Sequence, residues 1–276
     1  FVGSTPIAKY IYETAAHNGK RVQALGGAKN HAVVMPDADM EFTADALVGA
    51  AYGSAGERCM AISTVVAVGE AGDALLPLLK TKAAQIKVGR GDAVDTGMGP
   101  VISAAHRDRI VSLIASGAAQ GAELVLDGRG IAVAGGEHGF FVGPTLFDRV
   151  TPAMDIYREE IFGPVLIVLR ADSFDAAVKL INANLYGNGT AIFTGSGHWA
   201  RRFENEIEVG MVGVNVPIPV PMAFFSFGGW KASLFGDLHM HGMEGVVFYT
   251  RTKVVTSRWP APAERTGGTL AMPTLG

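Results

Sequence analysis

Apolar and polar positions along the chain form strand-like runs that alternate with helix-like runs over about half of its length. The strand-like runs are short and apolar, whereas the helix-like runs carry apolar residues at intervals of three and four. Strands that alternate with helices are typical of an α/β domain with a largely parallel sheet. The predicted strands are 32–35, 62–68, 123–126, 140–146, 165–169, 190–194 and 210–216, and the predicted helices are 42–52, 71–84, 104–119, 174–183 and 198–207.

The ends of the chain carry further predicted elements, namely a helix over about 6–17, a short strand at 22–25, and strands at 246–249 and 254–257. The chain opens at Phe1 with the pattern of a strand end and a glycine turn, which suggests that a preceding segment is missing. Unpaired strands near the other end would favour association between chains. The Pro- and Gly-rich tail after Trp259 is predicted to be loose.

Composition argues against several functional classes. The chain has 276 residues, 49% hydrophobic and 18% charged, so it can form one large domain or two small ones around a sizeable core. The net charge of -3 and the lack of a Lys/Arg block argue against a nucleic-acid partner. The most apolar stretch, 211–227, contains three prolines and Asn215, which argues against a membrane span. The protein is therefore expected to be soluble and intracellular.

Cys59 is the only cysteine, which excludes an intrachain disulfide and fits a reducing compartment. It lies between the predicted helix 42–52 and the predicted strand 62–68, and such junctions place a side chain at a cleft. Ala61 leaves space beside the sulfur, and nearby glycines allow a close backbone approach. These features favour a nucleophile that acts as thiolate. The alternative is a small buried hydrophobic residue.

The run Gly53-Ser54-Ala55-Gly56-Glu57-Arg58-Cys59-Met60-Ala61 resembles the nucleophile segment of the aldehyde dehydrogenase superfamily, in particular of its CoA-acylating methylmalonate-semialdehyde dehydrogenases. The resemblance implies that Cys59 attacks the carbon of an aldehyde. Arg58 is expected to favour the thiolate by its charge and to anchor a substrate carboxylate in a bidentate manner. An ion pair of Arg58 with Glu57 or another surface acid is the alternative.

The start of the first helix, at Gly3 and Ser4, presents free backbone N–H groups that suit a phosphate. The full glycine fingerprint of a dinucleotide fold is absent, so an ordinary capped helix is the alternative. The resemblance implies that Gly3 and Ser4 contact the pyrophosphate of NAD. It also places Gly26, in the Gly26-Gly27 turn, among the cofactor contacts.

A second segment with candidate cofactor chemistry reads Glu159-Glu160-Ile161-Phe162-Gly163-Pro164. A carboxylate two positions before an aromatic residue can accept hydrogen bonds from a ribose diol while the ring packs on a flat heterocycle. A loop ion pair and a core phenylalanine are the alternative. The resemblance implies that Glu160 binds the nicotinamide ribose and that Phe162 contacts the nicotinamide ring.

Ala24-Leu25-Gly26-Gly27 stands where hydrolytic members of the superfamily have Glu-Leu-Gly-Gly, whose Glu activates the water that releases the acyl group. The spacing from this segment to Asp37 is one residue longer than in those enzymes, so the vacant position is either Ala24 or Leu25. Neither side chain can accept a proton. An acyl-thioester on the cysteine is therefore predicted to persist until the thiol of coenzyme A takes the acyl group.

The segment Ser226-Phe227-Gly228-Gly229 matches a Phe-Gly-Gly sequence that lies near the aldehyde tunnel in the superfamily, so Phe227 is a candidate for lining that tunnel. A core phenylalanine is nearly as good an interpretation. His239 and His241 lack a third ligand at metal-binding spacing, and no metal is assigned.

The resemblance spans essentially the whole chain but only the C-terminal portion of the superfamily's usual length. It implies a remnant of an NAD-binding domain at 1–25, a catalytic domain at 26–245, and oligomerisation strands with a tail at 246–276. The absent portion would hold further NAD contacts and an Asn of the oxyanion hole. The implied reaction is NAD-dependent oxidation of methylmalonate or malonate semialdehyde, with loss of carbon dioxide, to propionyl-CoA or acetyl-CoA.

Two alternatives remain open. The chain is a non-catalytic fragment of such an enzyme, or it is a hydrolytic aldehyde dehydrogenase that gives the free acid. The expected partners are a small aldehyde that bears a carboxylate, coenzyme A and further copies of the chain, in a bacterial cytoplasm or a mitochondrial matrix.

Overall fold

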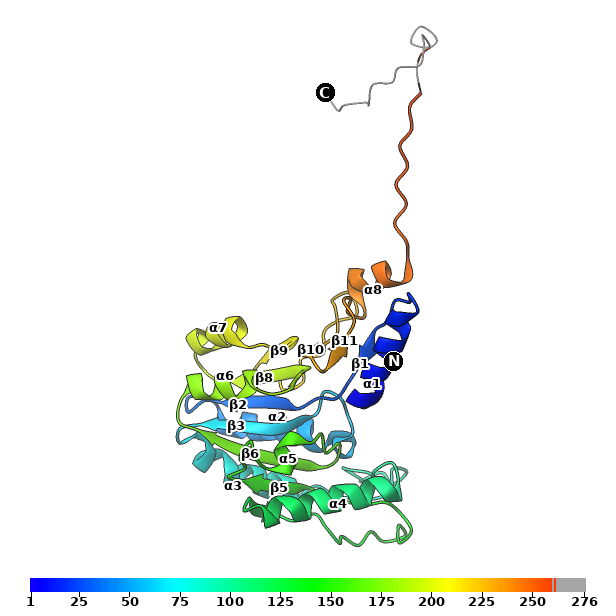
Figure 1. Cartoon of the computed structure of the whole chain (residues 1–276). Helices are drawn as coiled ribbons and strands as arrows, with labels where there is room; N and C mark the ends of the chain where they lie inside the picture. The colour runs from blue at the N-terminus through cyan, green and yellow to red at the C-terminus, as the bar shows by residue number, and fades with distance from the viewer. Residues whose placement is uncertain (260, 262–276) are drawn as a thin grey trace.

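A seven-stranded sheet organises the computed structural model, which describes residues 1–259 and 261 (Figure 1). Its strand order is β4-β5-β6-β3-β2-β8-β9. Every neighbouring pair is parallel except β4 with β5. The strands are β2 (Asn30–Val34), β3 (Ile62–Val68), β4 (Glu123–Leu126), β5 (Thr145–Asp148), β6 (Val165–Ala171), β8 (Gly189–Phe193) and β9 (Met211–Val214). The prediction of an α/β fold with a largely parallel sheet is confirmed.

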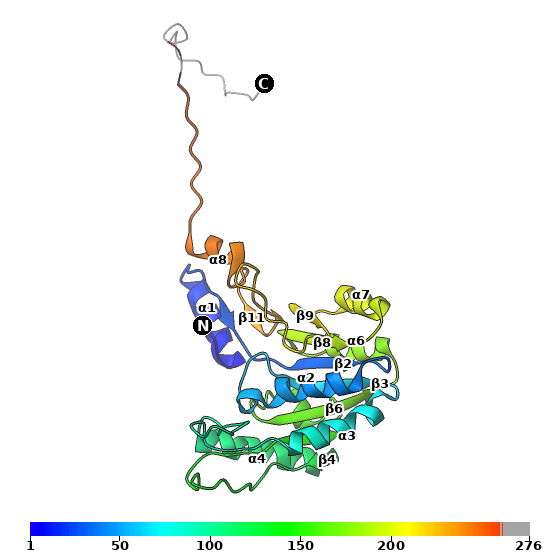
Figure 2. The ribbon, with the colours of Figure 1, turned by 180° about the vertical axis from the view of Figure 1, so that it is seen from behind.

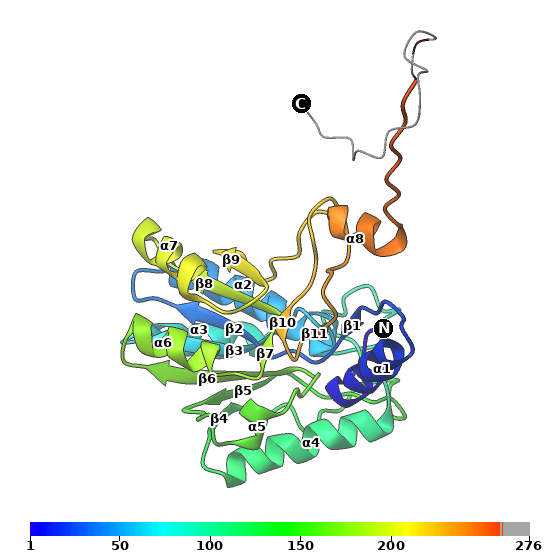
Figure 3. The ribbon, with the colours of Figure 1, turned by 45° about the horizontal axis from the view of Figure 1, so that its top comes forward.

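Helices cover both faces of this sheet (Figures 1 and 2). One face packs on α2 and α3, and the other packs on α6 and α7. Helices α4 and α5 contact each other beside β5 (Figure 3). The helices are α1 (Thr5–His17), α2 (Met40–Tyr52), α3 (Ala71–Ala84), α4 (Ala104–Ala119), α5 (Asp155–Arg158), α6 (Phe174–Asn182), α7 (Gly197–Glu206) and α8 (Gly242–Tyr249), with a 3-10 turn η1 (Gly53–Gly56).

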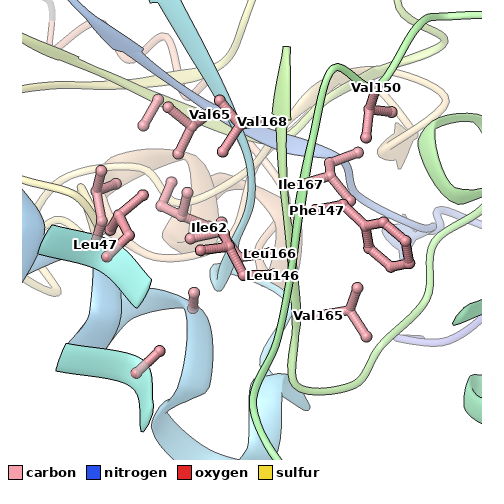
Figure 4. Close-up of a cluster of buried hydrophobic side chains, with 14 of the residues drawn as sticks. Leu47, Ile62, Val65, Leu146, Phe147, Val150, Val165, Leu166, Ile167 and Val168 are labelled. Atoms are coloured by element: carbon pink, nitrogen blue, oxygen red, sulfur yellow. The ribbon is translucent and has the colours of Figure 1, made fainter. Parts of the chain in front are cut away.

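Strand β2 shows how the sequence pattern builds the two layers. Ala32 and Val34 belong to the core on the α2 and α3 side, and Val33 between them belongs to the core on the α6 and α7 side. All three are fully buried, so both faces of this central strand are covered. Figure 4 shows part of the larger core, where Leu47 of α2 lies near Val65 and Ile62 of β3.

Several helices begin at a short polar residue whose side chain caps the first turn. Ser103 accepts a hydrogen bond from the N–H of His106 at 3.2 Å, which confirms it as the cap of α4. Asp39 caps α2 and Ser173 caps α6 in the same way. These caps fix where the three helices begin.

Two small sheets bring residues 230–235 against earlier parts of the chain. Strand β1 (Ala24–Leu25) pairs antiparallel with β11 (Leu234–Phe235), and β7 (Tyr186–Gly187) pairs antiparallel with β10 (Trp230–Lys231). Helix α1 therefore lies beside the segment that follows β9 (Figure 1).

The two strands predicted near the end of the chain are wrong. Residues 246–249 lie in α8, and 254–257 have no regular structure. A strand needs a partner edge, whereas a helix closes its own backbone hydrogen bonds, as between the N–H of Gly245 and the carbonyl of His241 at 2.8 Å. The carbonyls at the end of α8 accept hydrogen bonds from Arg21. The predicted strand 140–146 also starts too early, since β5 begins at Thr145.

The tail beyond Trp259, predicted to be loose, lies almost wholly outside the described residues. Within 1–259 and 261, no helix has the length and apolar character that a membrane crossing requires.

Candidate active site

A sharp turn carries Cys59 from the end of α2 to the start of β3. In this turn Ser54, Ala55 and Gly56 all have positive φ, between 52° and 70°. A Cβ on Gly56 would lie 2.1 Å from the carbonyl oxygen of Gly163, so only glycine permits this approach. The turn therefore presses the nucleophile segment against the loop that holds Glu160 and Phe162.

Two pockets meet at the thiol. Cys59, Glu160 and Phe162 line both of them, and Cys59 is exposed to solvent. The large pocket measures about 450 Å³ and is lined by Val2, Gly3, Ser4, Thr5, Pro6, Gly26, Cys59, His106, Arg109, Glu159, Glu160, Phe162 and Tyr186. The small pocket is lined by Ala28, Asn30, Ala51, Gly56, Arg58, Cys59, Ala61, Ile62, Ser63, Glu160, Ile161, Phe162, Gly163 and Val165. Six of the eight residues predicted from sequence thus meet at the large pocket, and Arg58 reaches the small one.

Partial burial by the walls of these pockets raises the pKa of the Cys59 thiol, and the charge of Glu160 raises it further. The N–H groups of Cys59 itself and of Met60 act in the opposite direction. The expectation that Arg58 promotes the thiolate stays a prediction.

Arg58 lies in the wall of the small pocket and points back toward α2. Its Nη2 donates to the carbonyl oxygens of Gly49 at 2.9 Å and Ala50 at 3.2 Å, which belong to the last turn of that helix. Its Nε is buried and has no hydrogen-bond partner in the described part of the chain. The alternative ion pair with Glu57 is not formed, because Glu57 contacts His106 and the N–H of Ile102.

Glu160 is held at the meeting point of the pockets. Its Oε1 accepts a hydrogen bond from the N–H of Ala28 at 3.0 Å. A Cβ on Gly27 would lie 2.7 Å from Oε2, so the absence of a side chain there leaves room for the carboxylate. Burial raises the pKa of Glu160, while the Ala28 N–H and the charges of Lys29 and Arg109 oppose this shift. The carboxylate is thus immobilised and faces the thiol.

Three side chains that were not predicted from the sequence make hydrogen bonds to the backbone of the loop that contains Glu160. They are a lysine, an arginine and a histidine. Lys29 is 3% exposed, and its Nζ donates to the carbonyls of Ile156 at 2.6 Å and Glu159 at 2.8 Å. Burial lowers the pKa of this lysine to about 7. Arg109 donates to the carbonyls of Glu160 and Ile161, both at 3.1 Å.

His106 completes this set, since its Nε2 lies 2.6 Å from the carbonyl oxygen of Phe162. Phe162 has a φ of 56°, an unusual value for a residue with a side chain, and its ring is partly exposed in the large pocket. Lys29, just before β2, and two side chains of α4 thus hold every carbonyl from Glu159 to Phe162. The loop is rigid before any ligand arrives.

Gly3, Ser4 and Gly26 form the far wall of the large pocket with the start of α1. The Ser4 side chain makes no capping hydrogen bond, which leaves the first turn open to an acceptor from a ligand. Thr5, also missed from sequence, accepts a hydrogen bond from the N–H of Gly27 at 2.8 Å and so ties α1 to the Gly26-Gly27 turn.

Ala24 and Leu25 are buried in β1, just before this wall. The carboxylates that line the two pockets are Glu159 and Glu160. Neither belongs to the Ala24 segment, where a hydrolytic enzyme would have its general base.

Phe227 lies apart from these pockets. It forms an isolated bridge with Met240, and its ring centre is 6.1 Å from that of His241. It lines neither pocket at Cys59, so its assignment to the aldehyde tunnel stays a prediction. His239 contacts Glu244 at 2.9 Å, and within the described residues no group of three metal-ligating side chains occurs.

The sequence profile of the aldehyde dehydrogenase family matches residues 1–255. Malonate-semialdehyde dehydrogenase of Pseudomonas aeruginosa is 60% identical over all 276 residues, which cover 56% of that protein. A probable methylmalonate-semialdehyde/malonate-semialdehyde dehydrogenase (acylating, mitochondrial) of Drosophila pseudoobscura pseudoobscura is 55% identical over the same residues, 53% of its length. The chain spans about half the length of these relatives.

Solved structures of proteins from the same family are also similar to this chain. A putative methylmalonate-semialdehyde dehydrogenase from Sinorhizobium meliloti, in complex with NAD, superposes with a TM-score of 0.93 and 56% identity. The match covers 95% of this chain and 53% of that one. Methylmalonate-semialdehyde dehydrogenase from Oceanimonas doudoroffii gives the same TM-score with 57% identity.

Proposed function

This chain belongs to the aldehyde dehydrogenase family. We propose that it contributes the nucleophilic thiol for a CoA-acylating oxidation of malonate or methylmalonate semialdehyde. The observation that carries this proposal is the meeting of Cys59, Glu160 and Phe162 at two adjoining pockets. A thiol, an immobilised carboxylate and an exposed aromatic ring are the groups that this chemistry requires at one place.

The large pocket fits the nicotinamide half of NAD. Glu160 offers a fixed acceptor for the ribose hydroxyls, and the partly exposed ring of Phe162 offers a flat surface. The uncapped start of α1 at Gly3 and Ser4, with Gly26 beside it, suits the pyrophosphate. When bound, NAD supplies the acceptor for the hydride that leaves the aldehyde carbon.

The residues of this chain then perform the covalent chemistry. The sulfur of Cys59 forms a bond to the aldehyde carbon after the thiol has lost its proton, and the backbone N–H of Cys59 stabilises the resulting oxyanion. Loss of hydride leaves an acyl-thioester on Cys59. The thiol of coenzyme A attacks the acyl carbon, a new C–S bond forms, and the bond to the Cys59 sulfur breaks.

Coenzyme A rather than water is proposed as the acyl acceptor because both candidate positions for the hydrolytic base hold apolar side chains. Ala24 and Leu25 are buried in β1 and cannot accept a proton. The acyl group loses carbon dioxide in this reaction class, so malonate semialdehyde yields acetyl-CoA and methylmalonate semialdehyde yields propionyl-CoA.

Arg58 is proposed as the anchor of the substrate carboxylate. Its place in the wall of the small pocket beside Cys59 supports this role, and its buried, unpaired Nε is a donor that an incoming oxygen can satisfy. Nη2 already serves the carbonyls of α2, so the expected bidentate grip requires one of those bonds to be exchanged.

The domain division at residues 25 and 245, the association of chains through residues after 246, and a place in a bacterial cytoplasm or a mitochondrial matrix belong to the same proposal. The proposed location is supported by the relatives, which are bacterial or mitochondrial proteins.

A non-catalytic role is the second candidate, because the chain covers only 53–56% of its relatives' length. Measurement of NADH formation from malonate semialdehyde, with and without coenzyme A, separates the candidates. NADH formation that depends on coenzyme A supports the proposal. Equal rates without it indicate the hydrolytic reaction, and no NADH in either case indicates the non-catalytic role.

A further inference from the structure

The backbone carbonyl of Cys59 is held by two side-chain amides from different strands. Nδ2 of Asn30, at the start of β2, donates to it at 2.8 Å. Nδ2 of Asn188, just before β8, donates to the same oxygen at 3.0 Å. Both asparagines are almost fully buried, with 2% and 5% of their surface exposed. One donor is enough to satisfy a buried carbonyl oxygen, and this carbonyl has two.

Each asparagine is itself fixed by further contacts. Asn30 also donates to the carbonyl of Ala61 at 3.0 Å and accepts from the N–H of Gly189 at 3.1 Å. Nδ2 of Asn188 lies 3.1 Å from the sulfur of Met60. The two amides therefore connect the starts of β2, β3 and β8 to the peptide unit that follows the nucleophile.

That peptide unit has two ends. Its carbonyl belongs to Cys59 and points toward the amides, while its N–H belongs to Met60. The two groups are antiparallel across a planar trans peptide, so fixing the carbonyl also fixes the direction of the N–H. The Met60 N–H is one of two backbone donors that favour the thiolate form of Cys59.

We infer that Asn30 and Asn188 are positioning residues for the nucleophile, which orient the peptide between Cys59 and Met60 so that its N–H faces the sulfur. The inference rests on the proposed role of Cys59 but concerns the thiol alone. Neither asparagine touches the reacting atoms. A purely structural role would stabilise the fold without this orientation.

The charged and titratable groups that line the two pockets with the thiol are Arg58 beside it, Glu159 and Glu160 from the loop before β6, His106 and Arg109 from α4, and Tyr186 of β7. None of them is changed by substitution of the two asparagines. In the neutral variant Asn188→Leu, a shift in thiol reactivity can therefore be traced to the backbone, whereas Asn188→Asp also adds a negative charge.

The test is the pH dependence of alkylation of the sole cysteine by iodoacetamide, in the folded chain without aldehyde, NAD or coenzyme A. Asn188→Leu keeps the branched shape of the side chain and removes the donor. If the amides orient the peptide, this variant raises the pKa of Cys59 by about one unit and slows alkylation about tenfold at pH 7.5. If the substitution only loosened the packing around Cys59, the thiol would become more exposed. Its pKa would then fall and alkylation would be faster, which is the opposite result.

Asn188→Asp is the second variant, since it keeps the shape but places an acceptor where the donor stood. It should slow alkylation at least as strongly as Asn188→Leu. Asn182→Ala is the matched control. Its side chain also makes two hydrogen bonds, but these join α6 to the segment before β9. It should leave the alkylation profile unchanged.

Far-ultraviolet circular dichroism and a thermal melt establish that each variant is folded before alkylation. An unchanged or lowered pKa of Cys59 in folded Asn188→Leu and Asn188→Asp overturns the inference. The outcome is independent of NADH formation, so failure of the proposed reaction is distinguishable from failure of this inference.

Discussion

The main-chain N–H of Ala28 donates to Oε1 of Glu160 at 3.0 Å, so the turn after β1 holds the carboxylate that raises the pKa of Cys59. Glu160, which is proposed to bind the ribose, is thus electrostatically coupled to the thiol of Cys59.

Glu160→Gln should therefore activate the thiol. The amide oxygen can still accept from Ala28, but the negative charge beside Cys59 is gone, so the pKa of the thiol falls. Iodoacetamide should alkylate Cys59 about two- to tenfold faster at pH 7.5. Glu159→Gln, in the same pocket but not among the groups that shift this thiol, is the control. An equal gain in both variants would count against a specific coupling.

Lys29→Met should destabilise the fold. The change leaves the buried carbonyl of Ile156 and the partly buried carbonyl of Glu159 without their donor, and an unsatisfied buried group costs roughly 1–3 kcal/mol. Urea unfolding at pH 7 should show a loss of roughly 2–4 kcal/mol. A loss below about 0.5 kcal/mol would show that water replaces the lysine at no cost.

Lys29 also predicts a pH dependence of stability. Its pKa is about 7 in the folded chain and 10.5 as a free side chain, so between these values the unfolded state binds more protons. The free energy of unfolding contributed by this group therefore rises with pH from about 7 to about 10.5. Lys29→Met should lack this rise in urea titrations at pH 7, 8.5 and 10. Lys179→Met, on the exposed face of α6, should keep it.

Arg58→Leu should separate substrates by charge. Loss of the proposed anchor should lower kcat/KM for malonate semialdehyde at least tenfold, while kcat/KM for propanal should change less than threefold. Equal losses on both aldehydes would indicate that Arg58 only secures the end of α2 through Gly49 and Ala50.

Alanine substitutions at Gly26 and Gly27, in the turn after β1, should have different consequences. On Gly27 a Cβ lies 2.7 Å from Oε2 of Glu160, a flexible side-chain end, so Gly27→Ala should displace the carboxylate and weaken NAD binding at little cost in stability. On Gly26 it lies 2.4 Å from the backbone oxygen of Ala232, so Gly26→Ala should lower the melting temperature. Calorimetry of NAD binding together with thermal melts checks this difference, and the reverse pattern would contradict it.

The sequence sufficed for much of the fold because the buried strands and amphipathic helices leave a local pattern. Both faces of β2 are covered, and its apolar run Ala32–Val34 shows this directly. The prediction for residues 246–249 was wrong because the local pattern there is ambiguous. The apolar run 246–249 fits a helix or a strand, and local pattern alone does not decide between them, whereas the structure places it in α8.

The candidate site was partly visible in sequence because its residues lie in recognisable segments. Cys59, Glu160 and Gly3 were found in this way. Lys29 and Asn188 gave no comparable signal, since a lysine usually lies at the surface and an asparagine between two glycines usually marks a turn. Their roles depend on contacts between segments more than 100 residues apart, such as that between Lys29 and Glu159 with a separation of 130. Long-range pairing of this kind cannot be read from local pattern.

The most direct test of the central claim is mass spectrometry of the intact protein after incubation with malonate semialdehyde and NAD in the absence of coenzyme A. We predict an acyl adduct on the peptide that contains Cys59, stable in water over minutes and discharged as acetyl-CoA when coenzyme A is added. An adduct that hydrolyses to free acid at the same rate with or without coenzyme A, or the absence of any adduct on Cys59, would contradict the account.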